Sequence, residues 1–316
     1  MSRRPHVLAV GDTVTVDALR LTVDGVMGQG SFGCVYRVKD PRGRTFALKA
    51  ETFVRGDFSQ LAHENKVYRL LRGVHGVPTI HGFARDAARG MSYLVMDLLG
   101  PNLQDVLENA PHKRVPLRET CIITMRILDR LADMHHVGLL HRDVKPQNFL
   151  LANDLGGRSS VWAVDFGLVK PFRDRHGVHI PHRDNKGPGL TGTPRFASTF
   201  THAGHESSRR DDIESLLYVA AYLFKGKLPW QNLPRIPGVD LRSPEGKQRK
   251  HARIHALKLE HSPDELFDGM PRFPGLARYA RGLTFDAVPD YAFIRREVKA
   301  TYDATQPRCT AHASTS

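Results

Sequence analysis

Three glycines between two β-rich runs place the strongest constraint on the fold of this chain. The segment Gly28–Val35 has the pattern Gly-x-Gly-x-x-Gly-x-Val, and strand-like runs lie on both sides of it, at Leu19–Met27 and Cys34–Lys39. Glycines let a backbone approach phosphates without interference from a Cβ atom. A dinucleotide-binding fold continues from its glycines into a helix, whereas the β-branched Val35 favours a strand here. The pattern therefore predicts a phosphate-covering flap, with a dinucleotide-binding fold as the minor alternative.

A lysine and a glutamate suited to such a site follow the glycines. Lys49 lies near the end of the alternating run Thr45–Ala50, and Glu64 is the only acid in the centre of a helical pattern over 61–71. A single strand lysine is usually a solvated edge residue, but the distance of Lys49 from the glycines favours a role with nucleotide phosphates. We predict that Lys49 and Glu64 form an ion pair.

Residues 141–151 concentrate an acid, a lysine and an amide. Asp143 can accept a proton from a hydroxyl, and Lys145 can neutralise a phosphoryl group in transfer. Asn148, and Asp165 after the next strand-like run, offer the oxygen ligands that Mg²⁺ prefers. A short match such as His-Arg-Asp taken alone is more often a solvated turn. The ordered set predicts phosphoryl transfer from a nucleotide, with Mg²⁺ as the metal.

Composition bounds the class of protein without naming a partner. The 316 residues are 41% hydrophobic and 25% charged, which is ordinary for a globular chain. The formal net charge of +13 indicates either a basic soluble surface or an affinity for acidic proteins, phosphates or nucleic acid. The three cysteines are far apart and suit a reducing compartment. The longest apolar run, Leu216–Phe224, is too short to span a membrane, so we expect a cytoplasmic or nuclear protein.

The rest of the chain is expected to be mainly helical. Periodicity predicts helices over 103–108, 118–136 and 209–224, an exposed loop over 231–246, further helices to about 300, and a disordered tail over 301–316. A basic segment follows Asp165 and contains three histidines at spacings of three, His176, His179 and His182. A metal site there is disfavoured, because Gly177 and a proline break the helix that would align the rings. An exposed loop that binds an anionic substrate is the preferred interpretation.

These motifs resemble those of eukaryotic protein kinases, and later segments resemble the casein kinase 1 family. The segments that carry the closer resemblance are His179–Lys186, Leu190–Ser198, Ser208–Leu216, Leu228–Gln231, Arg281–Asp286 and Pro289–Tyr291. Most kinases carry Ala-Pro-Glu after the activation segment, whereas this family does not, and this chain has Ala197-Ser198-Thr199. The resemblance covers about Leu19 to Glu297.

The resemblance implies an α+β fold of two lobes, a small β-rich N-lobe and a larger helical C-lobe. It implies a leader over 1–18, an N-lobe over 19–96, a hinge over 97–100, a C-lobe over 101–300 and a short tail. The activity implied is a serine/threonine kinase that uses ATP and Mg²⁺ on acidic or already phosphorylated protein substrates. We also expect a monomer that binds neither membrane nor nucleic acid. The competing hypothesis is a pseudokinase or a basic scaffold that binds anionic partners without catalysis.

The resemblance also implies roles for individual residues. Catalysis falls to Asp143, Lys145, Lys49 and Glu64, and Mg²⁺ binding falls to Asn148 and Asp165. The nucleotide-binding residues implied are Met27, Gly28, Gln29, Gly30, Ser31, Phe32, Gly33, Cys34, Val35, Ala47, Lys49, Met96, Asp97, Leu99 and Leu150. Within this set, Met96 is the gatekeeper and the backbone of Asp97 and Leu99 contacts adenine.

Three further groups complete the implied assignments. Arg195 and Lys250 would recognise an anion on the substrate, although the inserted loop before Lys247 affects the placement of Lys250. An anion in the activation loop would be bound by the cations Arg142, Lys170 and Lys186. Asp212 would be the buried acid that supports the segment around Asp143.

Overall fold

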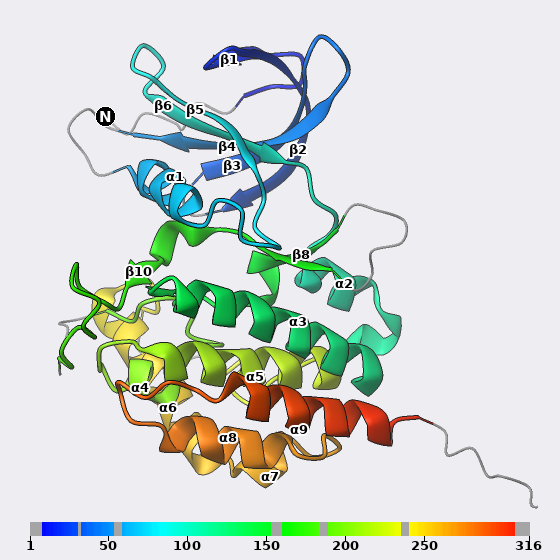
Figure 1. Ribbon diagram of the computed structural model, residues 1–316, viewed down its shortest axis with the longest axis vertical. Coiled ribbons are helices and arrows are strands. Elements are labelled where there is room, and N and C mark those ends of the chain that lie inside the picture. Colours follow the sequence, from blue (N-terminus) through cyan, green and yellow to red (C-terminus); the bar gives the residue numbers. More distant parts are fainter. Residues whose placement is uncertain are drawn as a thin grey trace, which may run out of the picture. The chain divides into compact units, whose positions relative to one another are not determined.

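The computed structural model describes residues 8–30, 33–53, 59–152, 160–183, 189–234 and 240–306. The chain forms two compact units. Unit 1 comprises residues 1–103 and 147–170 and contains an antiparallel sheet, whereas unit 2 comprises residues 104–146 and 171–316 and is mainly helical (Figure 1). The predicted α+β fold with a β-rich and a helical lobe is confirmed.

The sheet of unit 1 is built from six antiparallel strands in the order β1-β2-β3-β4-β6-β5. Their bounds are β1 Thr13–Val16, β2 Leu19–Gly30, β3 Gly33–Lys39, β4 Thr45–Thr52, β5 Ile80–Asp86 and β6 Met91–Asp97. Alternate residues such as Leu21, Val38, Leu48 and Val95 are almost fully buried and form the core of this unit. This period of two is the pattern of a sheet with one face packed inward.

The glycine segment is a β-hairpin, as the sequence predicts. Strands β2 and β3 pair so that Gly28 lies opposite Val35 and Gly30 lies opposite Gly33. A strand on both sides excludes the dinucleotide-binding alternative, in which a helix follows the glycines. Gly33 has a φ of +139°, and a Cβ atom there would collide with the carbonyl oxygen of Ala50 on the next strand. Ser31 and Phe32 lie outside the described residues.

The end of β4 caps the helix that follows it. Ser59 is the N-cap of α1 (Gln60–Leu70), and its hydroxyl accepts a hydrogen bond from the N–H of Ala62. The carboxylate of Glu51, at the end of β4, accepts from the Ser59 hydroxyl at 2.8 Å and from the Gln60 N–H at 3.0 Å. A carboxylate at a helix N-terminus satisfies free N–H groups and complements the helix dipole. This cap fixes α1 to the strand that carries Lys49.

Unit 1 also contains a short hairpin from later in the chain. Its strands are β8 (Phe149–Leu151) and β9 (Val161–Ala163), and the short helical turns η2 (Pro146–Asn148) and η3 (Phe166–Leu168) flank it; the boundary between the units falls after the first residue of η2. The resemblance assigned Asn148 and Asp165 to the helical lobe, but the structure groups both with unit 1. The reason is that β8 bonds to residues 100–102, where the Gly100 N–H donates to the Leu151 carbonyl, and η3 packs on α1.

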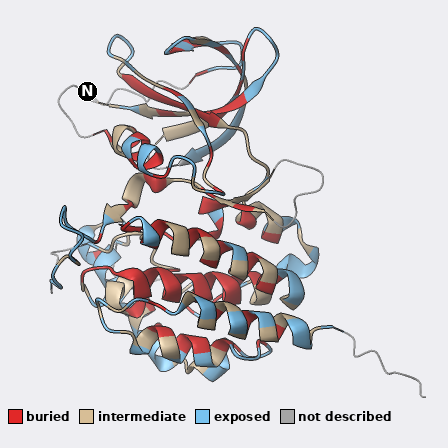
Figure 2. Cartoon of the chain, in the orientation of Figure 1, coloured by how far each residue is buried: buried red, intermediate tan, exposed pale blue. Residues whose placement is uncertain are grey.

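Unit 2 is organised around one buried helix. Its helices are α2 Leu103–Asn109, η1 Pro111–Lys113, α3 Leu117–His136, α4 Thr199–His202, α5 Arg209–Lys225, α6 Pro244–Glu260, α7 Pro263–Leu266, α8 Phe273–Gly282 and α9 Tyr291–Ala304. Helix α5 is buried from Arg209 to Leu223 (Figure 2) and packs against α3 and α8, while α9 packs against α3. A helix that is buried on all sides forms the core of a helical unit, as predicted from its apolar run.

Helices α3 and α5 lie antiparallel. The N–H of Val115, just before α3, donates to the carbonyl of Leu223 near the end of α5 at 2.8 Å. At the opposite end, His135 near the end of α3 lies 2.9 Å from Asp212 near the start of α5. Since α3 has 20 residues, the two ends are about 30 Å apart.

Two predicted boundaries in unit 2 are wrong by a few residues. The loop predicted over 231–246 ends earlier, because Ser243 caps α6 by accepting from the Gly246 N–H and Pro244 occupies the first helical turn. The tail predicted from 301 begins later, because α9 continues to Ala304 and Thr301 is fully buried. Residues 307–316 lie outside the described ranges.

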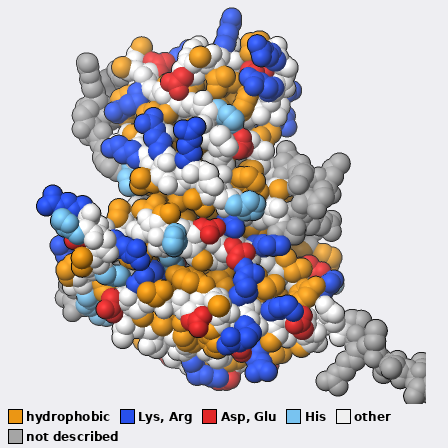
Figure 3. Space-filling view, in the orientation of Figure 1, with side chains coloured by type: hydrophobic (Ala, Val, Ile, Leu, Met, Phe, Trp, Pro, Cys, Tyr) orange, Lys and Arg blue, Asp and Glu red, His pale blue; other side chains and the backbone are white. Residues whose placement is uncertain are grey.

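Two observations, one on surface charge and one on the helices, bear on possible partners. In the face shown in Figure 3, Lys and Arg side chains are scattered among acidic and apolar ones and do not form one continuous stripe. Within the described ranges, no helix combines the length and the apolar character that crossing a membrane requires.

Candidate active site

Lys49 connects two carboxylates within unit 1. Its Nζ atom lies 2.6 Å from Glu64 Oε2 on α1 and 2.8 Å from Asp165 Oδ1 at the end of the β8–β9 hairpin. The predicted Lys49–Glu64 ion pair is therefore present, and Asp165 joins it. Phe166 beside Asp165 is fully buried and packs on Tyr68 of α1, with ring centroids 4.7 Å apart. This packing keeps Asp165 and Glu64 close to one another.

The environment of Lys49 keeps its amine charged. Burial lowers the pKa of Lys49, but the adjacent carboxylates of Glu64 and Asp165 outweigh that effect and raise the pKa above its ordinary value. Removing charges from water is costly, so a buried pair depends on close contact and full hydrogen bonding. The cluster thus presents a permanent cation at a site where only 16% of the lysine side chain is exposed.

Asn148 and Asp165 lie at the same end of the β8–β9 hairpin. Asn148 comes directly before β8, and Asp165 follows shortly after β9, in an antiparallel pair where Phe149 is opposite Ala163. The Val164 N–H donates to the Asn148 carbonyl at 2.9 Å and closes this end. Asp165 has a φ of +63°, an uncommon backbone conformation that is often found at functional sites. One carboxylate and one amide oxygen donor fit a hard cation such as Mg²⁺.

Asp143 has its own set of partners in unit 2. Its Oδ2 atom lies 2.6 Å from Lys145 Nζ, and its Oδ1 atom accepts from the Thr193 N–H at 2.9 Å and the Thr193 hydroxyl at 2.8 Å. Gly192 has a φ of +84°, and a Cβ atom there would collide with the carbonyl oxygen of Arg142. Glycine at this position allows Thr193 to approach the acid.

Asp212 supports the segment that carries Asp143. Its carboxylate accepts hydrogen bonds from the backbone N–H groups of His141 and Arg142, each at 2.8 Å, and lies 2.9 Å from His135 Nε2. Burial raises the pKa of Asp212, but the bond and charge of His135, with the other donors, hold it below its ordinary value. Arg142 has a φ of +63°, so these contacts maintain an uncommon backbone conformation next to Asp143. The structure thus has the supporting contact that the resemblance implied.

The residues assigned to the nucleotide all belong to unit 1. Met27, Val35, Ala47 and Leu150 lie on β2, β3, β4 and β8 respectively. Met96 is buried on β6, where the Tyr68 hydroxyl lies 4.0 Å from its sulfur. The backbone N–H of Asp97 already donates to the Thr79 carbonyl. The carbonyl of Asp97 and the backbone of Leu99 are therefore the groups to test for adenine contact.

Arg195 and Lys250 lie on neighbouring parts of unit 2. The guanidinium of Arg195 stacks over Tyr222, 5.4 Å from the ring centroid, and Lys250 is exposed on α6. Arg195 precedes α4, and α4 packs against α6. The stacking shows that Arg195 also braces its own segment.

The three cations assigned to an activation-loop anion have different surroundings. Burial lowers the pKa of Arg142, while Glu206 and Asp212 nearby act in the opposite direction, so this cation has acidic neighbours in unit 2. Lys170 is half-buried at the end of unit 1. Lys186 lies outside the described residues. Among those that are described, no group of three or more His, Cys, Asp or Glu side chains is placed to bind a metal.

Sequence reasoning missed a buried network behind residues 194–199. Lys258 of α6 is fully buried, and its amine donates to the carbonyls of Pro194 and Ala197. Glu214 accepts hydrogen bonds from Thr199, Tyr218 and Arg281, and its ion pair with Arg281 is 3.0 Å long. One signal was available, because Lys258 follows the buried Ile254 by four residues and so lies on the same face of α6.

The Lys258 amine predicts a specific dependence of stability on pH. Burial lowers its pKa from 10.5 to about 7. Between these values the unfolded chain binds more protons at this group than the folded chain, so its contribution makes stability rise with pH. We expect the free energy of unfolding of Lys258→Met, measured in urea, to gain less than that of the wild type between pH 7 and 9. Taking the difference between the two chains cancels the pH dependence that comes from the titratable groups they share. Parallel profiles of unfolding free energy against pH would contradict the prediction. The charged and titratable groups that face the amine are Glu214, Arg281, His202 and His255.

The two clusters contain the parts that phosphoryl transfer requires, namely a buried cation with carboxylates, two oxygen donors for a metal, and an acid beside a lysine. In addition, the family model of the protein kinase domain matches residues 21–252. This match covers most of the 316 residues and contains both clusters. The chain therefore belongs to the protein kinase family.

Proposed function

We propose that the chain is an active serine/threonine kinase of the casein kinase 1 type, which transfers the γ-phosphate of ATP to acidic or already phosphorylated proteins. The observation that carries the proposal is the complete Lys49–Glu64–Asp165 cluster, in which the lysine contacts both carboxylates. A pseudokinase has no need to keep this arrangement. Asn148 and Asp165 would bind Mg²⁺, which supplies charge neutralisation on the transferring phosphates when bound.

The remaining residues have distinct roles in this proposal. Lys49 binds the α- and β-phosphates, and the β2–β3 hairpin covers them with backbone N–H groups. Asp143 orients the substrate hydroxyl and accepts its proton. Lys145, 2.6 Å from Asp143, holds that carboxylate in place and neutralises the phosphoryl group as it moves. Transfer is therefore achieved by positioning and by charge.

Support for the casein kinase 1 type comes from residues 194–216. In place of Ala-Pro-Glu, the chain has Ala197-Ser198-Thr199, and this segment is attached to α5 by side chains. Ser198 donates to Asp211, and Thr199 contacts Glu214, which pairs with Arg281. The Ser208–Leu216 segment, one of those that resemble the casein kinase 1 family, thus anchors Ser198 and Thr199 to α5.

Phosphate transfer from labelled ATP is the direct test of the proposal. We expect the purified chain to phosphorylate dephosphorylated casein on serine or threonine in the presence of Mg²⁺, and the Asp143→Asn chain to serve as the blank. Nucleotide binding should be measured on the same samples by thermal shift. Binding of ATP without any transfer would overturn the proposal in favour of the pseudokinase, and failure to bind ATP would favour the basic scaffold.

The preference for phosphorylated substrates yields a second prediction. Arginine can bind a phosphate with two parallel hydrogen bonds. The double substitution Arg195→Ala with Lys250→Ala is therefore expected to reduce kcat/KM for a phospho-primed peptide about tenfold or more, and to reduce kcat/KM for the unprimed peptide much less. Added salt should narrow the difference. Equal losses on both peptides would show that Arg195 acts only by bracing Tyr222 and its own segment. Arg195→Lys is the matched control, because it keeps the charge and loses the planar fork.

A further inference from the structure

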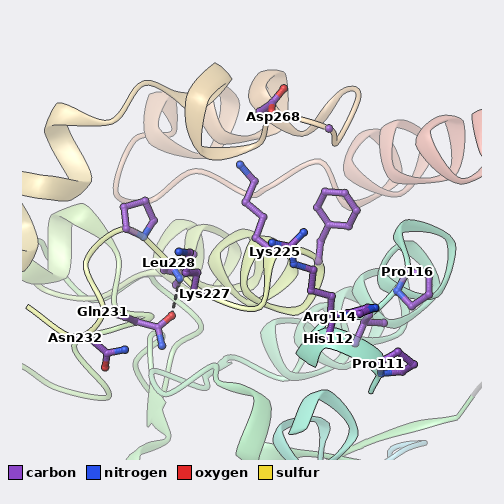
Figure 4. Close-up of a pocket in the computed structure, with 14 residues that line it drawn as sticks. Pro111, His112, Arg114, Pro116, Lys225, Lys227, Leu228, Gln231, Asn232 and Asp268 are labelled. Carbon is purple, nitrogen blue, oxygen red and sulfur yellow. Dashed lines mark hydrogen bonds between the residues drawn. The ribbon is translucent and has the colours of Figure 1, made fainter. Parts of the chain in front are cut away.

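A cavity of about 930 Å³ opens in unit 2 away from the residues discussed so far. It lies between the connection from α2 to α3, the connection from α5 to α6, and the loop before α8 (Figure 4). Its volume is in the range of sites that bind ligands or peptide side chains. None of the lining residues belongs to either cluster of the candidate active site.

The lining combines an apolar floor with a basic rim. Prolines, Val115, Phe224 and Leu228 provide apolar surface. The ionisable residues of the rim are His112, Arg114, Lys225, Lys227 and Asp268, of which only the last is acidic. A complementary occupant is acidic and carries an apolar anchor. A nucleic acid fits less well, because Phe224 and His112 have the only aromatic rings among the described lining residues and base stacking along a strand needs several.

The backbone around the cavity has the same uncommon conformation as the candidate active site. His112, Lys113 and Asn232 have φ values of +54°, +51° and +52°. L-residues rarely adopt this conformation, and where they do the surrounding structure must enforce it, commonly at binding sites. Gly226 contributes to this, because it lies so close to the Lys113 carbonyl that a Cβ atom would collide with it. The two connections are thus packed together and present a preformed surface.

The cavity lies at the far end of the α3–α5 pair from Asp143. It is lined by residues before α3 and at and after the end of α5, whereas Asp143 follows α3 and its supporting Asp212 lies near the start of α5. The separation along α3 is about 30 Å. An extended peptide rises about 3.3 Å per residue, so roughly nine residues would be needed to join the two places.

We infer that this cavity is a docking site for an acidic segment of a substrate protein, a segment with an apolar anchor that lies at least about nine residues from the phosphorylated serine or threonine. The inference rests on the proposed function for the identity of the partner. The segment places its anchor on Phe224 and the exposed prolines of the lining, and its carboxylates on the exposed Arg114 and Lys227.

Binding of casein without nucleotide tests the site independently of catalysis. Fluorescence anisotropy with labelled, dephosphorylated casein is expected to show that Arg114→Glu with Lys227→Glu weakens binding by about tenfold or more. Arg296→Glu with Lys299→Glu makes the same change of charge on exposed residues of α9 and is expected to have little effect. Asp268→Lys removes the acid of the rim and should tighten binding severalfold, a gain that a damaged fold would not produce.

Kinetics complete the test. In the Arg114→Glu, Lys227→Glu chain the KM for casein should rise about tenfold, while kcat and the KM for a short peptide substrate stay unchanged. The docking site would be overturned if the rim variant (Arg114→Glu with Lys227→Glu) and the α9 variant had equal effects. It would also be overturned if neither the rim variant nor Asp268→Lys changed casein binding. Absence of phosphorylation by the wild type, with casein binding still dependent on the rim, would instead contradict the proposed function and leave the site standing.

Discussion

Asp143→Asn is expected to lower the rate of phosphate transfer by about 10²–10⁴-fold, the usual contribution of a positioned general base. The carboxylate has two sides with different partners, Lys145 on Oδ2 and Thr193 on Oδ1. An amide can still accept from the Thr193 N–H, but its NH₂ group then faces the Lys145 amine, donor against donor. The substitution therefore removes the proton acceptor and also displaces the lysine. Single-turnover transfer to a peptide at saturating ATP measures the chemical step directly.

The control for Asp143→Asn is the nucleotide itself. The residues assigned to ATP belong to unit 1, whereas Asp143 belongs to unit 2. ATP affinity should therefore change little, and the melting temperature should stay close to that of the wild type. Thr193→Ala is a useful companion, because it removes the hydroxyl at 2.8 Å and keeps the backbone N–H bond. Near-normal turnover of Asp143→Asn would show that another residue orients the hydroxyl.

Lys49→Arg is the second substitution with a large expected effect. We expect a loss of about 10²-fold or more in kcat/KM for ATP, because a planar guanidinium does not replace a compact ammonium between two carboxylates 2.6 and 2.8 Å away. The charge is retained, so the carboxylates stay compensated and the fold should survive. Steady-state kinetics with varied ATP, together with a thermal melt, separate the two effects.

Lys49→Met provides the contrast. Glu64 is almost fully buried, with a side chain 2% exposed. Removing its partner leaves an unpaired buried carboxylate, which typically costs about 3–5 kcal/mol. Lys49→Met should thus lose both activity and stability, and Lys49→Met with Glu64→Gln should recover part of the stability without the activity. If Lys49→Arg retained normal kcat/KM, the lysine would not be acting on the phosphates in this way.

Local patterns were sufficient to predict most of unit 1. The glycines between two strand-like runs specify the β2–β3 hairpin, because period-two alternation and β-branched residues are local signals. The lone acid of the 61–71 pattern identified Glu64 correctly for a similar reason: the centre of the helix holds only one candidate. The missed starts and ends in unit 2 reflect weak boundary signals, such as Ser243-Pro244 within a segment rich in proline and glycine.

Features made by long-range packing could not be predicted in the same way. The burial of Lys258 depends on carbonyls about 60 residues earlier in the chain. Its spacing of four from Ile254 indicates the face of α6 but is not enough to mark a lysine as a core residue. The cavity beside α3 and α5 arises where three connections meet, each of them bearing residues with positive φ. Grouping of Asn148 and Asp165 with the sheet was missed because contacts, and not order along the chain, decide to which unit a hairpin belongs.

In the β8–β9 hairpin, the distance between the two proposed metal ligands does not depend on the length of the chain between them. Asn148 and Asp165 lie at the end that the Val164–Asn148 hydrogen bond closes, while residues 152–160 join the strands at the other end. The three register pairs of β8 and β9 and this hydrogen bond together set how far apart the two oxygen donors lie. We therefore expect that this connection can be lengthened, tagged or opened to give new chain termini without changing the distance between the two oxygen donors.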